Sequence, residues 1–373
     1  MNTPASSIPT HLGNETRVAS FEIKHTQFLD HLGTPLGPLP DFAKVPEELI
    51  KLYRAMVRTR LFDNKAIALQ RTGKMGTYAS SHGQEAVAIG MGSAMRPEDL
   101  LAPVYREHGT QFMRGVAMHE LLLYWGGDER GMDFAQQRHD FPDSVPIASQ
   151  IPHAVGAAYA FKLRKEPRVS VGVLGDGATS KGDFYEGLNI AGVWQLPVVI
   201  VIINNQWAIS LPRHEQSYAA TLAQKGIAAG VPCEQVDGND VIAMRYVMER
   251  ALDKARNGSG PTLIEALTYR ISDHTTADDA SRYRSPDEVE EQRQFDPIIR
   301  LKNHLTHHYE WGDANEQSLQ AEFSAEIEKE VKLYLDTPPM PPESMFDHLY
   351  ETLPAIYKEQ RDEIITRGGK NNG

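Results

Sequence analysis

Cysteine is nearly absent from the sequence, which has 373 residues and a single thiol, Cys233. One cysteine forms no disulfide within a chain, so the composition indicates a reducing compartment. We expect a cytoplasmic protein in which Cys233 is a small core residue. Long apolar runs are absent too, because the longest, Val198 to Ile203, has six residues. A membrane-spanning helix needs about 20 such residues, so no membrane is predicted as a partner.

The first 20 residues lack the features of a targeting segment. They contain no apolar core of the kind that a secretory signal needs. Their one arginine and one glutamate also make a poor transit peptide. We therefore interpret this segment as a polar arm.

An excess of positive charge is lacking as well. Lys and Arg number 38 against 50 Asp and Glu, which gives a net charge of −12. This sign argues against nucleic acid and anionic membranes as main partners. The overall balance does not forbid a local basic patch, so a bound phosphate stays open. Hydrophobic residues at 41% and charged residues at 24% are ordinary for a soluble globular protein.

The chain divides by composition into three predicted parts. Residues 1–45 are rich in prolines and glycines, which break helices, so we expect an extended N-terminal arm that lies on another surface. Residues 46–340 are predicted to form one large folded domain that begins with a helix. The break DTPPMPP precedes residues 341–373, which we expect to form a C-terminal helical tail.

Within the predicted domain, short apolar runs alternate with helical segments. The runs at 169–174, 196–203 and 262–267 are typical of buried strands, and we interpret 182–195 and 241–257 as helices. Strand, helix and strand in this order predict an α/β fold, a doubly wound parallel sheet with helical crossovers. The run VVIVII has no polar alternation, which indicates a strand covered on both faces.

The motif GDG lies where the first of these strands ends. Gly175 and Gly177 let the backbone approach a ligand closely, and the helix that follows offers N–H groups and a positive dipole end to a diphosphate. Asp176 lies at the carboxyl edge of the predicted sheet, where ligands of such folds bind. Asn205 and the backbone carbonyl of Trp207 follow the next strand at the same edge. These three hard oxygen donors suit the octahedral geometry of Mg²⁺.

A tight turn is the simplest explanation of GDG alone. The presence of Asp176 and Asn205 at the ends of two adjacent predicted strands favours a metal site instead. The dinucleotide motif GxGxxG fails, because Ser180 stands where the third glycine would be and no acidic residue lies about 20 positions further on. The motif GxxxxGK[ST] is absent, since the GK pair at 73–74 precedes a methionine. An NAD-dependent dehydrogenase is therefore disfavoured.

The stretch GDGATSKGDFYEGLNIAGVWQLPVVIVIINNQWAIS resembles the thiamine-diphosphate motif, in which a GDG triplet precedes an NN pair. Over about residues 46–350 the chain is similar to the alpha subunit of the first component of 2-oxo acid dehydrogenase complexes. Three further blocks carry this resemblance: YREHG at 105–109, IASQIPHAVGAAYA at 147–160 and YRISDHTTADDASRYRS at 269–285. The resemblance implies a thiamine-diphosphate-binding fold over the predicted domain.

The resemblance also implies roles for individual residues. Asp176, Asn205 and the Trp207 carbonyl would hold Mg²⁺, and the backbones of Gly177 and Ala178 would contact the diphosphate. His274 would be the catalytic histidine, near the diphosphate and the incoming lipoyl group, although its polar flanks alone favour a solvated loop histidine. The full set of implied cofactor-binding residues is Tyr105, Arg106, Val145, Ile147, Asp176, Gly177, Ala178, Asn205, Trp207 and His274.

Several of these residues have a simpler alternative. Arg106 is in a pair that contacts phosphate in the family, but it also suits an ordinary surface ion pair. Ile147 matches an apolar residue under the bent cofactor, whereas its sequence context alone indicates a core residue. Ser149 and Gln150 match a loop that holds K⁺ in the branched-chain type. Thr275 lies near a phosphoserine of regulated relatives, and the sequence leaves phosphorylation there or at Ser281 open.

The implied reaction is the oxidative decarboxylation of a small 2-oxo acid, with transfer of the acyl group to a lipoyl group on an acyltransferase core. The family works as an α₂β₂ heterotetramer in which the beta subunit supplies the activating glutamate, so the chain is expected to be inactive alone. Pyruvate is favoured over a branched-chain 2-oxo acid, and acetoin cleavage is a third alternative. A scaffold that has lost catalysis is disfavoured, because Arg106, Asp176, Asn205 and His274 are all present.

Overall fold

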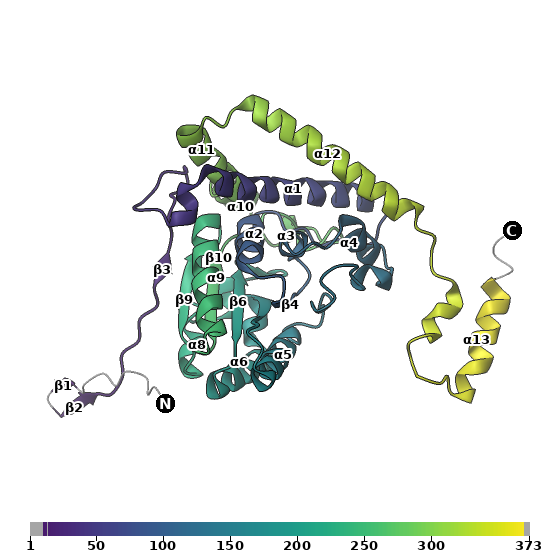
Figure 1. Ribbon diagram of the computed structural model, residues 1–373, viewed down its shortest axis with the longest axis horizontal. Helices are drawn as coiled ribbons and strands as arrows, with labels where there is room; N and C mark the ends of the chain where they lie inside the picture. The colour runs from purple at the N-terminus through teal and green to yellow at the C-terminus, as the bar shows by residue number, and fades with distance from the viewer. Residues whose placement is uncertain (1–9, 13, 369–373) are drawn as a thin grey trace.

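The computed structural model describes residues 10–12 and 14–368. Residues 1–9 and 13 of the predicted arm and residues 369–373 of the predicted tail lie outside the described residues. The arm begins with an antiparallel hairpin of β1 (Thr10–Leu12) and β2 (Glu15–Arg17) that lies away from the body of the protein (Figure 1). The chain then reaches the body at β3 (His25–Thr26), which joins one edge of the central sheet.

The centre is a six-stranded sheet in the order β3-β9-β10-β6-β5-β4, and every pairing in it is parallel. This confirms the predicted fold class. Each predicted strand is found within two residues of its expected bounds. The strands after β3 are β4 (Leu100–Ala102), β5 (Ser170–Gly175), β6 (Val198–Asn204), β9 (Cys233–Asp237) and β10 (Thr262–Leu267).

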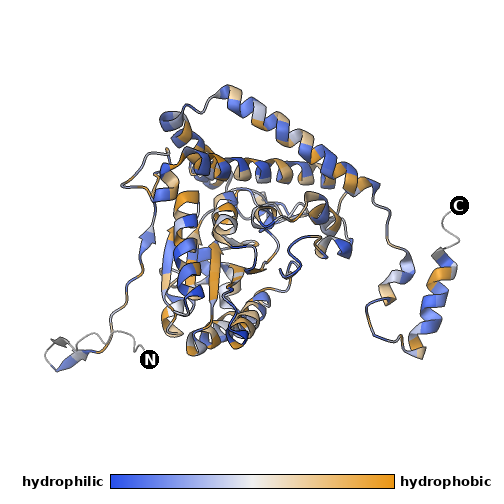
Figure 2. Cartoon of the chain, in the orientation of Figure 1, coloured by the Kyte–Doolittle hydropathy of each residue, from blue (hydrophilic) through white to orange (hydrophobic). Residues whose placement is uncertain are grey.

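Helices cover both faces of this sheet. On one face α5 (Gln150–Arg164) and α6 (Gly182–Trp194) pack against Val198, Ile200 and Ile202 of β6. On the other face α2 (Glu85–Ala94) and α9 (Val241–Arg256) pack against Val199, Val201 and Ile203. Successive side chains of a strand point to opposite faces. The run VVIVII therefore serves two cores at once, as its lack of polar alternation predicted, and it forms an apolar strip at the centre of Figure 2.

A layer of longer helices lies over the second face. The helix α1 (Pro46–Arg71) starts with Pro at its first position, and α12 (Asp313–Asp336) crosses above it in Figure 1. The remaining helices are α3 (His108–Met113), α4 (Met118–Trp125), α7 (Arg213–Gln216), α8 (Lys225–Ala228), α10 (Pro286–Arg293) and α11 (Pro297–Tyr309). Short 3₁₀ turns are η1 (Asp41–Lys44), η2 (Glu129–Met132), η3 (Gly177–Ser180), η4 (Ala280–Arg282) and η5 (Pro342–Phe346). A small hairpin joins β7 (Trp207–Ala208) and β8 (Leu211–Pro212).

The chain ends in a segment that stands apart from the body. After α12, η5 and α13 (Ala355–Gly368) pack on each other, and Figure 1 shows them separated from the sheet and its helices. The division into arm, domain and tail at residues 45 and 340 stays a prediction. Among the described residues, no helix combines the length and the apolar character needed to cross a bilayer.

Candidate active site at the carboxyl edge of the sheet

A cavity of about 310 Å³ lies where β5 and β6 end. The sheet register pairs Gly175 with Ile203, so Asp176 and Asn205 follow neighbouring strand ends, as predicted. All the predicted cofactor-binding residues except Val145 line this cavity. Val145 is largely exposed and lies outside it. The structure therefore brings together residues that lie up to 169 positions apart in the sequence, from Tyr105 to His274.

Asp176 is buried with one carboxylate oxygen unpaired. The residue is only 2% exposed, and its Oδ2 has no hydrogen-bond partner among the described residues. Burial raises the pKa of Asp176 to about 6, although nearby backbone N–H groups and the charge of Arg270 oppose this shift. An unpaired buried carboxylate is costly in free energy. The chemistry of this oxygen therefore fits a cation, and Mg²⁺ accepts such a ligand.

The turn after Asp176 is built for close backbone approach. A side chain at Gly177 would bring its Cβ within 2.5 Å of the Ala208 Cβ, so only glycine fits there without a shift. Residues 177–180 form the 3₁₀ turn η3, and α6 starts only at Gly182. This start confirms the helix predicted at 182–195, and the glycine-rich turn before it is the 3₁₀ turn. The backbone N–H groups of Gly177 and Ala178, which would face a bound ligand, therefore belong to a 3₁₀ turn.

Asn205 and Trp207 present further oxygen atoms at this edge. Asn205 Nδ2 donates to Gln84 Oε1 at 3.1 Å, which fixes the orientation of its amide. Asn205 Oδ1 accepts from the Trp207 N–H at 3.3 Å, and the Trp207 carbonyl accepts from Arg270 Nη1 at 3.2 Å. Each oxygen has a second lone pair. The Asn205 amide oxygen and the Trp207 carbonyl oxygen therefore each retain a lone pair that suits a cation shared with Asp176.

Arg106 and His274 are held against each other. The Arg106 guanidinium donates to the Ser80 carbonyl at 2.7 Å, to the His274 carbonyl and to His274 Nδ1 at 3.0 Å. Burial lowers the pKa of His274 to about 4, and the charges of Arg106 and Arg270 add to this shift. His274 is therefore neutral near pH 7 and accepts at Nδ1, so it differs from a solvated loop histidine. Arg106 is buried and is not part of a surface ion pair.

Arg270 is a functional candidate that sequence reasoning missed. It is 1% exposed, lines the cavity, and donates to the carbonyls of Trp207 and Ile209 and to the Tyr283 hydroxyl. Burial, followed by repulsion from Arg106, lowers the pKa of Arg270 to about 10. Its position beside Tyr269 in the YRISDH block was the available indication. Arg106 and Arg270 form a local basic pocket in a chain of net charge −12.

The segment before α5 forms the open rim of the cavity. Ile147 is 43% exposed and lines the cavity, so it is not a core residue of this chain. Ala148 follows with a φ of +67°, a strained conformation for a residue other than glycine. Ser149 Oγ donates to the Pro146 carbonyl at 2.7 Å, and Gln150 Nε2 donates to the Val173 carbonyl. Gln150 Oε1 is buried without a partner in the described part of the chain.

The fold and this edge define an α/β protein whose parallel sheet ends in a polar cavity, lined by a buried carboxylate, an amide and two guanidinium groups. Comparison with known proteins identifies its family. A family model described as the dehydrogenase E1 component matches residues 53–343. The chain belongs to this family and is an alpha-type subunit of a 2-oxo acid dehydrogenase, an enzyme that works with a beta subunit. The family depends on thiamine diphosphate.

Similar proteins cover nearly the whole chain. A protein named pyruvate dehydrogenase E1 component subunit alpha from Acholeplasma laidlawii is 44% identical over 325 residues, which is 86% of this chain and 94% of that protein. A 3-methyl-2-oxobutanoate dehydrogenase subunit alpha from Mycobacterium tuberculosis is 39% identical over 347 residues, 92% of this chain and 94% of its own. A pyruvate dehydrogenase E1 component subunit alpha from Staphylococcus aureus is 37% identical over 350 residues, 93% of each chain.

Proposed function

We propose that this chain is the alpha subunit of a pyruvate dehydrogenase, which decarboxylates pyruvate and acetylates a lipoyl group on an acyltransferase core in the cytoplasm. The observation that carries this proposal is the unpaired oxygen of buried Asp176 at the edge that also presents Asn205. A fold keeps such an oxygen at a cost unless a cation binds it. The relatives from Acholeplasma laidlawii and Staphylococcus aureus, both named for pyruvate, support the substrate.

The donor set supports a role for each group around the cofactor. Asp176 Oδ2, Asn205 Oδ1 and the Trp207 carbonyl would bind Mg²⁺, and the backbone N–H groups of Gly177 and Ala178 would face the diphosphate. Tyr105 and Arg106 would contact phosphate oxygens, for which the planar guanidinium offers paired donors. Bound there, thiamine diphosphate supplies the nucleophilic carbon and the electron sink for decarboxylation.

His274 has the geometry to move a proton in this site. Its ring lies beside Tyr105, with ring centroids 6.3 Å apart, and Nδ1 accepts from Arg106. The other ring nitrogen therefore carries the hydrogen in the neutral form. An anionic group bound to Arg106 would weaken the positive field on the ring, which raises its pKa toward the range useful for proton transfer.

The rim of the cavity supports a beta subunit as the other half of the site. Ile147, Ile209 and Leu211 line the cavity and stay partly exposed. Apolar side chains also face outward from the neighbouring helices: Tyr159 and Leu163 of α5, and Tyr185, Ile190, Val193 and Trp194 of α6. Exposed apolar surface of this kind marks a protein interface. We propose that the beta subunit covers it in an α₂β₂ assembly.

A branched-chain 2-oxo acid is the second candidate substrate. The Mycobacterium tuberculosis relative, named for 3-methyl-2-oxobutanoate, covers 92% of this chain. The loop of Ser149 and Gln150, predicted to hold K⁺, has an unpaired buried oxygen at Gln150 Oε1. This oxygen supports the predicted potassium site at the loop.

The test is reconstitution of the chain with its beta subunit. We expect acyl transfer to a lipoyl domain with thiamine diphosphate and Mg²⁺, a higher kcat/KM for pyruvate than for 2-oxoisovalerate, and no turnover by either subunit alone. Robust activity of the isolated chain would overturn the half-site proposal. A preference for 2-oxoisovalerate would transfer the assignment to the branched-chain type.

A further inference from the structure

We propose that Asp63, a buried carboxylate of α1, positions Arg106 and the loop of His274 for the reaction. It acts through residues 78–83, named here the platform segment. This inference rests on the proposed function for the roles of Arg106 and His274. The contacts of Asp63 with residues 78–83 are independent of that function. Asp63 does not line the cavity, so it is a positioning residue.

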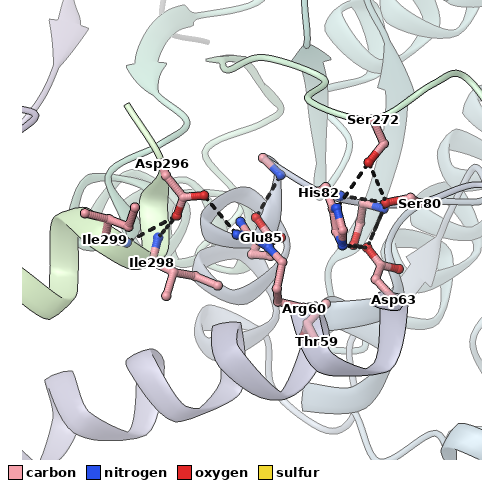
Figure 3. A network of polar contacts seen from close by, with 12 residues as sticks. Thr59, Arg60, Asp63, Ser80, His82, Glu85, Ser272, Asp296, Ile298 and Ile299 are labelled. Carbon is pink, nitrogen blue, oxygen red and sulfur yellow. Dashed lines mark hydrogen bonds and ion pairs between the residues drawn. The ribbon is translucent and has the colours of Figure 1, made fainter. Parts of the chain in front are cut away.

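Asp63 contacts the platform segment with both of its carboxylate oxygens. Its side chain is fully buried. Oδ2 accepts from the Ser81 N–H at 2.7 Å, from Ser81 Oγ at 2.8 Å and from Ser80 Oγ at 3.2 Å. Oδ1 accepts from the Tyr78 hydroxyl. Figure 3 shows Asp63 on α1 pointing toward Ser80 and His82.

The charge of Asp63 strengthens these contacts. Burial would raise the pKa of Asp63, but the neighbouring His108 and His82 rings and the hydrogen bond from Tyr78 outweigh it and hold the pKa well below its usual range. His108 Nδ1 lies 3.6 Å and His82 Nε2 3.9 Å from the carboxylate. Hydrogen bonds to an ionised acceptor are about twice as strong as neutral ones. The carboxylate thus fixes the shape of the platform segment.

The platform segment also forms hydrogen bonds with the loop that contains His274. Tyr78 and Thr276 exchange two hydrogen bonds, from Tyr78 N to Thr276 Oγ1 at 3.0 Å and from Thr276 N to the Tyr78 carbonyl at 2.9 Å. The His82 carbonyl accepts from the Ile271 N–H at 3.2 Å, and His82 Nδ1 lies 3.1 Å from Ser272 Oγ. The contacts thus involve residues before and after His274 in the sequence, and Figure 3 shows the one between Ser272 and His82.

The platform segment also orients Arg106 directly. The Ser80 carbonyl accepts from Arg106 Nη1 at 2.7 Å, and the other terminal nitrogen of the guanidinium donates to His274. A chain of contacts therefore runs from Asp63 through Ser80 to Arg106 and His274. Ser272, His82 and Asp63 do not form a hydrolytic triad, because 3.9 Å is too long for a hydrogen bond and Asp63 is already bound by its four donors.

The test compares Asp63→Asn with Asp99→Asn in the complex with the beta subunit. Asp99 is also fully buried and accepts from Arg96 N, Val169 N and two nitrogens of Arg256, but it precedes β4 at the amino edge of the sheet. It therefore controls for the loss of a buried carboxylate away from the site. Three quantities are measured for each protein: hydrogen exchange of the Ile271 and Thr276 amides, the thiamine diphosphate concentration for half-maximal activity, and the unfolding midpoint.

We expect Asp63→Asn to accelerate exchange at both amides and to raise the half-maximal cofactor concentration on the order of 10- to 100-fold, the range typical of residues that orient a ligand-binding group. We expect Asp99→Asn to lower the unfolding midpoint but to leave the amide exchange rates and the half-maximal cofactor concentration near their wild-type values. An Asp63→Asn protein with only a lowered midpoint overturns the inference. If Asp63→Asn does not fold, Tyr78→Phe, which removes one donor to Asp63, decides: faster exchange at Thr276 supports the inference and unchanged exchange overturns it.

Failure of the proposed function gives a different result. In that case the wild-type complex itself binds no thiamine diphosphate with Mg²⁺, whereas amide exchange still reports whether Asp63 holds the loop.

Discussion

Asp99 and Asp176 are two buried aspartates at opposite edges of one sheet, and their partners differ. Asp99, at the amino edge, accepts from two nitrogens of Arg256 at 2.9 Å and from two backbone N–H groups. Asp176, at the carboxyl edge, keeps Oδ2 without a partner among the described residues. Removing one partner of a buried ion pair destabilises a fold, and a buried charge without any partner is costly in free energy. Asp99 therefore stabilises the amino edge, whereas we propose that Asp176 binds a cation at the carboxyl edge.

The largest difference is expected in cofactor binding. Asp176→Ala removes the carboxylate proposed to bind Mg²⁺, so we expect Mg²⁺-dependent binding of thiamine diphosphate to fall by more than about 100-fold, beyond the loss typical of an outer-sphere residue. Calorimetric titration of the complex with its beta subunit measures this. Asp99→Asn is the matched control and should retain the wild-type affinity. Retained affinity in Asp176→Ala would remove Asp176 from the metal site.

For stability we expect the opposite order, with a larger loss from the change at Asp99 than from the change at Asp176. Asp99→Asn leaves Arg256 without its partner, and breaking a buried ion pair costs about 3 kcal/mol or more. Asp176→Asn removes a destabilising charge, so its free energy of unfolding should match or exceed that of the wild type. Urea unfolding of the isolated chain at pH 7 without Mg²⁺ measures both. Equal losses in the two variants would contradict the distinction between the edges.

The pH dependence of stability should show the same contrast. Burial raises the pKa of Asp176 to about 6, whereas an unfolded aspartate titrates near pH 3.9. The unfolded state loses its proton first, so the free energy of unfolding contributed by Asp176 falls as pH rises from about 4 to about 6. We expect this loss, on the order of 2 kcal/mol, to be absent from Asp176→Asn. Parallel stability curves for wild type and variant over this window would speak against the raised pKa.

A smaller effect is expected from Arg270→Lys. Arg270 donates to the carbonyls of Trp207 and Ile209 and to the Tyr283 hydroxyl, which one ammonium group does not reproduce in the same geometry. The proposed metal-binding carbonyl of Trp207 should be less well positioned. We expect the affinity for thiamine diphosphate with Mg²⁺ to fall on the order of tenfold, as for other residues that orient a ligand.

Arg282→Lys is the control for that change, because Arg282 lies in the same loop with a side chain that is 82% exposed. Its affinity should stay at the wild-type value. An equal loss in the two arginine variants would point to a general effect of loop charge.

The carboxyl edge was more predictable from the sequence than the contacts behind it. Asp176 and Asn205 were predicted together because each follows an apolar run long enough to indicate a buried strand. β4 was not predicted, since Leu100–Ala102 is too short to show a pattern, and β9 was missed because Cys233–Asp237 is polar and half-buried.

Arg270 and Asp63 show why the rest could not be predicted. A charged residue in a polar loop or on a long helix has the same local pattern whether it faces solvent or the interior. Their burial is decided by contacts with residues 78–83 and 207–209, which lie far away in the sequence. Ile147 shows the reverse case, because its sequence context alone indicated a core residue, whereas the chain leaves it at the rim of an open cavity.

The most direct test of the central claim is the metal dependence of cofactor binding by the wild-type complex. Thiamine diphosphate is titrated into the chain with its beta subunit, once with Mg²⁺ and once with excess chelator. The unpaired oxygen of Asp176 predicts saturable binding with Mg²⁺ and none detectable with chelator. Equal affinity under the two conditions would show that the carboxyl edge binds the diphosphate without a cation and would contradict the account.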